Sequence, residues 1–375
     1  MIRYTCEMEK PKVVILSTFL SPLRSGAEAC AEEVALGLSD QYEVTLVTAK
    51  MRRDLEREAM SGKREASVRI IRVGFGCMFD KWLYPFLAPQ VAKSLKPDIV
   101  HAVLETFAGL ALYRCRKAVP KAKRILTLQT TNRKFLKKRI VQSADKVTAI
   151  SSVLVRIAKE YERDDVISIS NGIHLEAIRM ARKEVKKIFG RILFVGRLEP
   201  MKGVDTLLDA FALIRKEFPH ASLHIVGDGS ERMRLKFLSE KLLIVDSITF
   251  TGRMDPPNLY REFAEAEVFC GLSRSEALGN VFLEAQAAGC VVIATRIGGI
   301  PDIVKSGETG ILVSPNSPEE AADAIKEVLY GEKLRMQMAE AGMQNAQKYD
   351  WSVIVEKYKK VYEEVLATKS ETSTK

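Results

Sequence analysis

The stretch ILFVGRLEPMKG, residues 192–203, decides the fold class of this chain. Four apolar residues lead into a glycine turn and a polar loop, after which Gly203 opens a helical pattern. A buried strand followed by a glycine turn and a helix is the repeating unit of a parallel sheet. Similar apolar runs alternate with helical patterns along the chain, at 13–17, 42–48, 68–73, 99–103, 125–128, 146–150, 223–226, 247–250, 268–271, 290–294 and 310–313. We therefore predict an α/β protein with doubly wound parallel sheets.

The chain of 375 residues is long enough for two domains of ordinary size. The charged segment 176–190 separates the two series of strands and is typical of a connecting helix or linker. We place the boundary within it, so that residues 1–180 form the first Rossmann-like domain and residues 181–350 form the second. Open parallel sheets bind ligands beyond the carboxyl ends of their strands, which predicts a binding cleft between the two domains.

Composition excludes several classes of protein. Hydrophobic residues make up 47% and charged residues 28%, as in globular proteins. The longest apolar runs are too short to span a membrane, and the first twelve residues lack the apolar core of a secretory signal. The six cysteines form no C-x-x-C pair and the four histidines do not cluster, so we expect no metal site. A cytoplasmic location is the expectation that follows.

The stretch SRSEALGNVFLEA, residues 273–285, combines groups that suit a sugar nucleotide. Glu276 and Glu284 lie eight residues apart, on either side of a predicted helix start. Carboxylates accept hydrogen bonds from sugar hydroxyls. Between them, Gly279, Asn280 and Val281 offer backbone N–H groups at the helix start, which suits phosphate. One short segment can therefore hold both halves of a sugar nucleotide.

Two cations follow the strand at 192–195. Arg197 and Lys202 flank the loop that begins at Gly196 and enters a helix. A departing nucleoside diphosphate gains negative charge in the transition state, so fixed cations beside it lower the barrier. The alternative is a pair of solvated surface cations.

Weaker signals follow other strands. Arg253, after the strand at 247–250, belongs to a turn that can present backbone to a nucleobase. Gly26, in the loop after the first strand, lets the backbone approach a phosphate held by the second domain. The chain has no P-loop and lacks G-x-G-x-x-G after its first strand, which disfavours a dehydrogenase.

Taken together, these segments resemble the family-4 retaining glycosyltransferases, the glycosyl transferases group 1, which have the GT-B fold. The resemblance covers nearly the whole chain, and its most specific element is the E-x7-E pattern of Glu276 and Glu284. It implies a metal-independent, cofactor-free enzyme that moves a hexose-type sugar from a nucleoside diphosphate sugar to an acceptor hydroxyl, with retained anomeric configuration. It also implies that the first domain binds the acceptor, that the second binds the donor, and that the last helix, 351–368, packs back on the first.

The resemblance implies a role for each candidate residue. Arg197 and Lys202 would stabilise the leaving diphosphate, and Glu276 would hold hydroxyls of the transferred sugar; these three are the expected catalytic residues. The remaining candidates would bind the donor: Glu284 at the ribose, and Gly26, Gly196, Arg253, Gly279, Asn280 and Val281 through the backbone or beside the diphosphate and base.

Two positions depart from the family pattern. The family commonly has a histidine where this chain has Val103, two residues after His101, and a second one where it has Gln129. The departure concerns the acceptor side and leaves the donor residues in place. Glu105 is close enough to replace some of the lost contact, and the alternative for it is a solvated loop carboxylate. The implied mechanism depends on positioning and charge stabilisation, so it does not need the histidine.

Two further functions remain open. A nucleotide-sugar epimerase or phosphorylase can use the same scaffold, and Val103 admits a noncatalytic protein that binds sugar nucleotides. The E-x7-E pattern favours sugar transfer over epimerase or phosphorylase activity. The noncatalytic alternative is disfavoured because the chain keeps the expected donor residues Arg197, Lys202, Glu276 and Glu284.

Positive charge is concentrated in the first half of the chain. Residues 1–172 hold 30 Lys and Arg against 19 Asp and Glu, whereas residues 173–375 hold 28 against 29. The clusters lie at 114–117, 121–124 and 133–140. Amphipathic basic segments bind anionic lipid, so we expect a glycan or lipid-linked acceptor and peripheral contact with the inner face of the cell membrane. A solvated basic face is the alternative. Nucleic acid is not expected, because no aromatic platform accompanies the charge.

Overall fold

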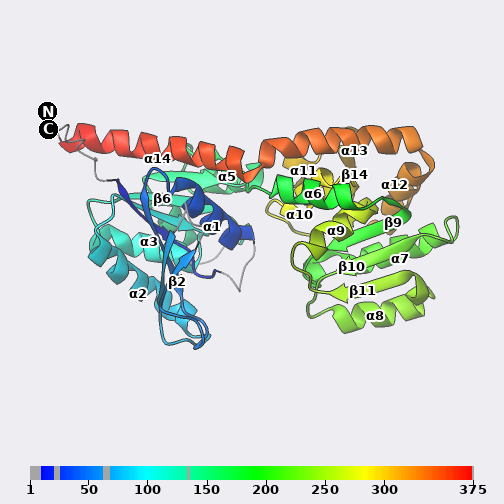
Figure 1. Ribbon diagram of the computed structural model, residues 1–375, viewed down its shortest axis with the longest axis horizontal. Coiled ribbons are helices and arrows are strands. Elements are labelled where there is room, and N and C mark those ends of the chain that lie inside the picture. The colour runs from blue at the N-terminus through cyan, green and yellow to red at the C-terminus, as the bar shows by residue number, and fades with distance from the viewer. Residues whose placement is uncertain (1–9, 21–25, 62–67, 133–135, 374–375) are drawn as a thin grey trace. The chain divides into compact units, whose positions relative to one another are not determined.

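The structure is a computed structural model and describes residues 10–20, 26–61, 68–132 and 136–373. The chain divides into two compact units (Figure 1). Unit 1 comprises Met1–Asn171 and Ser352–Lys375, and unit 2 comprises Gly172–Trp351. No helix among the described residues is both long enough and apolar enough to cross a membrane.

The first division between the units falls earlier than the sequence suggested. The segment 172–180 lies in unit 2 and contains the start of helix α6 (Leu175–Glu184). The buried side chains of this helix are Leu175, Ile178 and Ala181, which share one helical face. The helix packs against α9 (Asn258–Glu265) and α10 (Asn280–Ala287) of unit 2. A segment that looked like a linker is therefore part of the second unit.

Unit 1 is built around an eight-stranded sheet with the strand order β3-β4-β2-β1-β5-β6-β7-β8. Neighbouring strands are parallel except for β3 and β4, which are antiparallel. Its strands are β1 (Lys12–Leu16), β2 (Glu43–Ala49), β3 (Glu58–Ser61), β4 (Val68–Val73), β5 (Ile99–Val103), β6 (Lys123–Leu128), β7 (Lys146–Ala149) and β8 (Ile167–Ser168). Its helices are α1 (Gly26–Leu38), α2 (Asp80–Leu95), α3 (Phe107–Ala118), α4 (Lys137–Gln142), α5 (Ser152–Glu160) and, from Ser352 onward, α14 (Trp351–Ser373).

Unit 2 contains a six-stranded parallel sheet with the order β11-β10-β9-β12-β13-β14. Its strands are β9 (Ile188–Val195), β10 (Ser222–Val226), β11 (Ile248–Gly252), β12 (Ala266–Gly271), β13 (Val291–Thr295) and β14 (Gly310–Val313). Besides α6, α9 and α10, its α-helices are α7 (Val204–Arg215), α8 (Arg232–Lys241), α11 (Ile300–Ile303), α12 (Pro318–Tyr330) and α13 (Glu332–Ala346). Short 3₁₀ turns are η1 (Pro200–Lys202), η2 (Val245–Ser247) and η3 (Gln347–Tyr349). The predicted doubly wound α/β architecture is confirmed.

Both sheets have a point at which the chain changes its winding direction. In unit 2 the chain runs outward from β9 through β10 to β11, and then crosses to β12 on the other side of β9. In unit 1 the corresponding neighbours are β1 and β5. The loops after two such strands diverge and leave a crevice, which is where open α/β sheets bind ligands.

A buried polar cluster attaches α14 to the sheet of unit 1. The ring of His101 on β5 is hydrogen-bonded through Nδ1 to Tyr362 Oη on α14 at 2.7 Å, and through Nε2 to Thr127 Oγ1 at 2.7 Å. Thr127 is in turn hydrogen-bonded to Thr148 on β7 at 2.7 Å. Burial lowers the pKa of His101 to about 3, so the ring is neutral at physiological pH.

Candidate functional site

The candidate residues of unit 2 follow the two strands at its switch point. Strands β9 and β12 are paired in parallel, so their carboxyl ends lie at the same edge of the sheet. Arg197 and Lys202 follow β9, and Glu276 follows β12. These loops form the region where a ligand of such a sheet is expected.

The structure brings Lys202 and Glu276 into direct contact. The Nζ atom of Lys202 donates a hydrogen bond to Glu276 Oε2, and the two side chains are only 18% and 16% exposed. Partial burial makes such an ion pair stronger than one at an open surface. The two groups assigned to the diphosphate and the sugar are thus in contact with each other.

The backbone around Glu276 is held by the loop that follows β13. Gly299 N–H donates to the carbonyl oxygen of Glu276 at 3.3 Å. Gly298 has a φ of +54°, and a Cβ built on it would lie 1.9 Å from that same oxygen. Only glycine allows the two loops to approach this closely.

Arg274, which the sequence analysis did not single out, ties the β12 loop to the β9 loop. Its guanidinium is paired with Asp205 Oδ1 at 2.9 Å and donates to Thr206 Oγ1 at 3.0 Å. Its backbone N–H donates to the carbonyl oxygen of Met201 at 2.7 Å. Burial opposes the charge of Asp205, but the hydrogen bonds from Arg274, Thr206 N–H and Arg234 outweigh it and lower the pKa of that carboxyl.

Helix α10 begins directly after the Glu276 loop. Gly279 is its N-cap residue, with a φ of 92°, and no side chain caps the helix. Asn280 and Val281 form the first turn, and Glu284 lies one turn further on and is partly buried. The first N–H groups of a helix lack intrahelical partners, so this end suits an anion.

The other candidates do not join the Lys202–Glu276 pair. The side chains of Arg197 and Arg253 are exposed, and Arg253 forms a loose ion pair with Asp255 at 3.8 Å. Gly196 packs over the ring of Phe194. Gly26 is the first residue of α1 in unit 1. Among the described residues, no group of three or more His, Cys, Asp and Glu side chains could hold a metal ion.

In unit 1 the structure corrects the interpretation of Glu105. The residue is 4% exposed, so it is neither a solvated loop carboxylate nor a free replacement for a missing histidine. It is paired with the buried Lys137 at 2.8 Å and accepts the N–H groups of Gln129 at 2.8 Å and Thr130 at 3.1 Å. Val103 is fully buried in β5. Gln129 exchanges two side-chain hydrogen bonds with Asn171, both at 3.0 Å.

Comparison with known families accounts for almost the whole chain. Residues 24–177 match the model of Glycosyltransferase Family 4, and residues 179–345 match that of Glycosyl transferases group 1. An uncharacterized glycosyltransferase of Methanocaldococcus jannaschii is 30% identical over 290 residues, which are 74% of this chain and 79% of that protein. The chain belongs to the group 1 glycosyltransferases. The family predicted from the sequence is confirmed.

Other relatives have named activities, and two of them represent two different activities. The phosphatidyl-myo-inositol mannosyltransferase of Mycobacterium leprae is 28% identical over 285 residues, 73% of this chain and 75% of that protein. The D-inositol 3-phosphate glycosyltransferase of Corynebacterium jeikeium is 36% identical over 179 residues, 46% of this chain. Those residues span only 43% of the relative's length.

Solved structures show the same fold. Sucrose-phosphate synthase from Thermosynechococcus elongatus superposes with a TM-score of 0.84 at 20% identity, covering 96% of this chain and all of that one. Anabaena HepE in complex with UDP and glucose gives a TM-score of 0.75 at 19% identity, covering 94% of this chain and all of that one. The fold of this glycosyltransferase is GT-B, as predicted.

Proposed function

We propose that this glycosyltransferase moves a hexose-type sugar from a nucleoside diphosphate sugar to an acceptor hydroxyl, with retained anomeric configuration. The observation that carries the proposal is the partly buried Lys202–Glu276 pair at the switch point of unit 2. It joins a cation suited to the leaving diphosphate and a carboxylate suited to sugar hydroxyls.

The donor would use the groups around this pair. Lys202 and Arg197 bind the diphosphate, Glu276 accepts hydrogen bonds from the sugar, and Glu284 accepts them from the ribose. The first turn of α10, from Gly279 to Val281, donates backbone N–H groups to phosphate. Gly196 and Arg253 complete the donor contacts within unit 2. The complex of Anabaena HepE with UDP and glucose supports a nucleoside diphosphate as the leaving group.

The reaction follows from these roles. The bond between the sugar and the diphosphate breaks, its electron pair stays on the diphosphate, and an oxocarbenium-like sugar forms. The acceptor hydroxyl attacks from the face the diphosphate leaves, and a phosphate oxygen takes its proton. Lys202 and Arg197 stabilise the charge gained by the diphosphate. We propose that these cations take the part that a metal ion plays in other transferases.

We propose a phosphorylated or lipid-linked acceptor that binds to unit 1. The names of two relatives support this, since one acts on phosphatidyl-myo-inositol and the other on inositol 3-phosphate. The excess of positive charge in residues 1–172 suits such anions. Peripheral attachment to a membrane would bring the enzyme to a lipid acceptor.

The test measures transfer by the full chain. A panel of nucleoside diphosphate sugars is incubated with inositol phosphate or with vesicles containing phosphatidylinositol, and the released diphosphate and the anomeric configuration of the product are measured. We expect Lys202→Ala to lower kcat/KM by about 10²–10³. Lys216→Ala, which changes an exposed lysine of the same unit, should have no effect. Activity should persist in a chelator.

Three results would contradict the proposal. Full activity of Lys202→Ala would show that the Lys202–Glu276 pair does not have the assigned role in the reaction. Nucleotide-sugar binding without turnover with any acceptor would favour the noncatalytic alternative. Conversion of the donor without release of a nucleoside diphosphate would favour an epimerase.

A further inference from the structure

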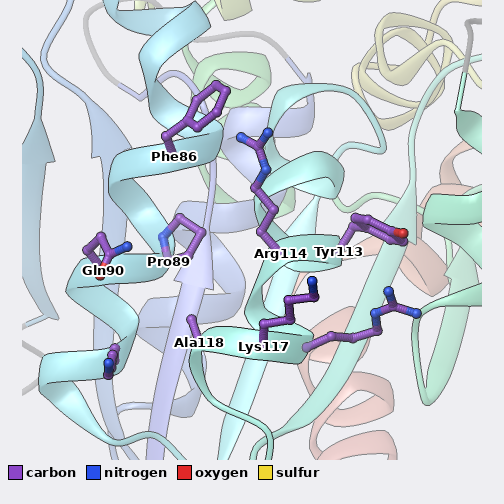
Figure 2. Close-up of a pocket in the computed structure, with 9 residues that line it drawn as sticks. Phe86, Pro89, Gln90, Tyr113, Arg114, Lys117 and Ala118 are labelled. Carbon is purple, nitrogen blue, oxygen red and sulfur yellow. The ribbon is translucent and has the colours of Figure 1, made fainter.

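A pocket of about 550 Å³ lies between α2 and α3 of unit 1, and none of its lining residues is among those assigned to the donor. Figure 2 shows Phe86, Pro89 and Gln90 on one helix, and Arg114 and Lys117 on the other. The lining residues include the cations Lys93, Arg114, Arg116 and Lys117 and no carboxylate. This pocket is therefore suited to an anion.

Large apolar side chains project from the segment beside the pocket. Phe75, Met78, Phe79, Trp82 and Phe86 are between 57% and 73% exposed. Trp82 and Phe86 are four residues apart and so share one face of α2. The ring of Trp82 packs edge-on against Phe107 at the start of α3, with centroids 5.0 Å apart. We call these five exposed side chains the aromatic ridge.

The aromatic ridge is held in place by a buried carboxylate. Asp80, which is fully buried, accepts the N–H groups of Phe75 at 2.9 Å, Gly76 at 2.7 Å and Cys77 at 3.2 Å. Burial opposes the charge of Asp80, but these hydrogen bonds outweigh it and lower its pKa. These hydrogen bonds fix the turn that carries Phe75 and Phe79, so the fold itself holds the two rings at the surface.

One nitrogen atom of a cation in the pocket lacks a hydrogen-bond partner among the described residues. The guanidinium of Arg114 stacks on the ring of Phe86 at 3.5 Å from its centroid. Its Nη1 atom is buried and has no hydrogen-bond partner among the described residues. A buried donor without a partner is costly, and a phosphate oxygen would satisfy it.

The sequence around the pocket contains many positively charged residues and almost no negatively charged ones. The segments 81–97 and 106–144, which include all of α3 and all of α2 except the buried Asp80, contain no Asp or Glu. The segment 133–140, which the sequence suggested for lipid contact, is less suitable. Residues 133–135 lie outside the described residues, Lys137 is buried against Glu105, and Ile140 is buried.

We propose that the α2–α3 face docks on an anionic lipid bilayer. The aromatic ridge enters the interface between headgroups and acyl chains, and Arg114 and Lys117 bind lipid phosphate in the pocket beside it. Aromatic side chains favour this interface, and each nearby Lys or Arg adds attraction to an anionic surface. The docking surface does not depend on the reaction catalysed.

Co-sedimentation of the full chain with vesicles tests the docking surface. Vesicles of phosphatidylcholine with phosphatidylglycerol should bind the protein, and vesicles of phosphatidylcholine alone should bind it weakly. At about 1 M salt, where the Debye length is about 3 Å, binding should fall sharply. Phe79→Ser/Trp82→Ser and Arg114→Glu/Lys117→Glu should each lower the partition coefficient at least about tenfold.

Matched variants separate the proposed surface from general effects. Met233→Ser/Phe237→Ser removes two exposed apolar side chains, four residues apart, from α8 of unit 2. Arg156→Glu/Lys159→Glu reverses two exposed charges on α5 with the spacing of Arg114 and Lys117. Both controls should bind vesicles nearly as well as the wild type. A loss as large as that of the α2–α3 variants would overturn the proposal.

Tryptophan fluorescence provides a second measurement. The chain has two tryptophans, and Trp351 is buried. In Trp351→Phe, anionic vesicles should shift the emission of Trp82 to shorter wavelength. Absence of a shift would overturn the proposal. It would also be overturned if light scattering showed a lipid-free dimer that Phe79→Ser/Trp82→Ser dissociates, because a second copy would then cover the aromatic ridge.

Discussion

At the scale of one residue, the burial of Glu105 gives its carboxylate a structural role, as the counter-ion of the buried Lys137. Its side chain and that of Lys137 are 2% and 3% exposed. Glu105→Gln would leave the charge of Lys137 buried without its counter-ion. We expect a loss of about 3–5 kcal/mol in the free energy of unfolding, measured by urea denaturation.

Two further variants test this reading of the pair. Glu105→Gln/Lys137→Met should recover much of the lost stability, because no unpaired charge remains. Glu58→Gln breaks the exposed Arg69–Glu58 pair and should cost less than about 1 kcal/mol. The account would be wrong if Glu105→Gln cost no more than Glu58→Gln.

The sequence could locate residues of this kind but could not pair them. Lys202 and Glu276 were found because each follows a strand, and the ends of parallel strands share one edge of the sheet. Their direct contact depends on loop geometry, and the role of Arg274 depends on partners in two other segments. Glu105 was misread because Lys137 lies 32 positions away, and nothing local signals that it is buried.

At the scale of elements, the Glu276 loop depends on its packing against the loop after β13. In Gly298→Ala the new Cβ would displace the carbonyl oxygen of Glu276, so the loop must shift. A misplacement of about 1 Å can cost about 10²-fold in rate, and we expect a loss of that order in kcat/KM. Transfer assays on the purified variant measure it.

Gly307 supplies the matched control for this steric effect. It also has a positive φ, +84°, but nothing lies within 4 Å of an added Cβ. Gly307→Ala therefore carries only the backbone cost of about 1–2 kcal/mol and should keep full activity. Equal activity of the two variants would show that the position of the Glu276 loop does not limit the reaction.

Regular elements were predicted well where their signal is local, and missed where it is not. Buried parallel strands such as β5 and β14 are short, mainly apolar runs, and the structure has them at the predicted residues. Helix α2 contains Pro85 and Pro89, and proline normally ends a helix, so the local sequence does not predict a continuous helix there. Strand β3 was missed because its residues, EAMS, show no apolar alternation.

At the scale of the whole molecule, the last helix, α14, is joined to the sheet of unit 1 by a hydrogen bond to one histidine. His101 and Tyr362 are 261 residues apart in the sequence and are hydrogen-bonded in the core. Burial holds the pKa of His101 at about 3 in the folded state, against about 6.5 in the unfolded chain. Between about pH 3 and about pH 6.5 the unfolded state therefore binds up to one proton more than the folded state.

This difference predicts how acid acts on unit 1. Stability should fall as the pH decreases from about 6.5 to about 3, with a slope of up to about 1.4 kcal/mol per pH unit from His101. His101→Gln can still hydrogen-bond but cannot titrate, so the dependence of its unfolding free energy on pH should be shallower by that slope. His220→Gln, which replaces an exposed histidine of unit 2, should leave the slope unchanged. Denaturant unfolding of the three proteins between pH 7 and pH 4 measures the slopes. If wild type and His101→Gln had the same slope, His101 would not be the group through which acid loosens α14.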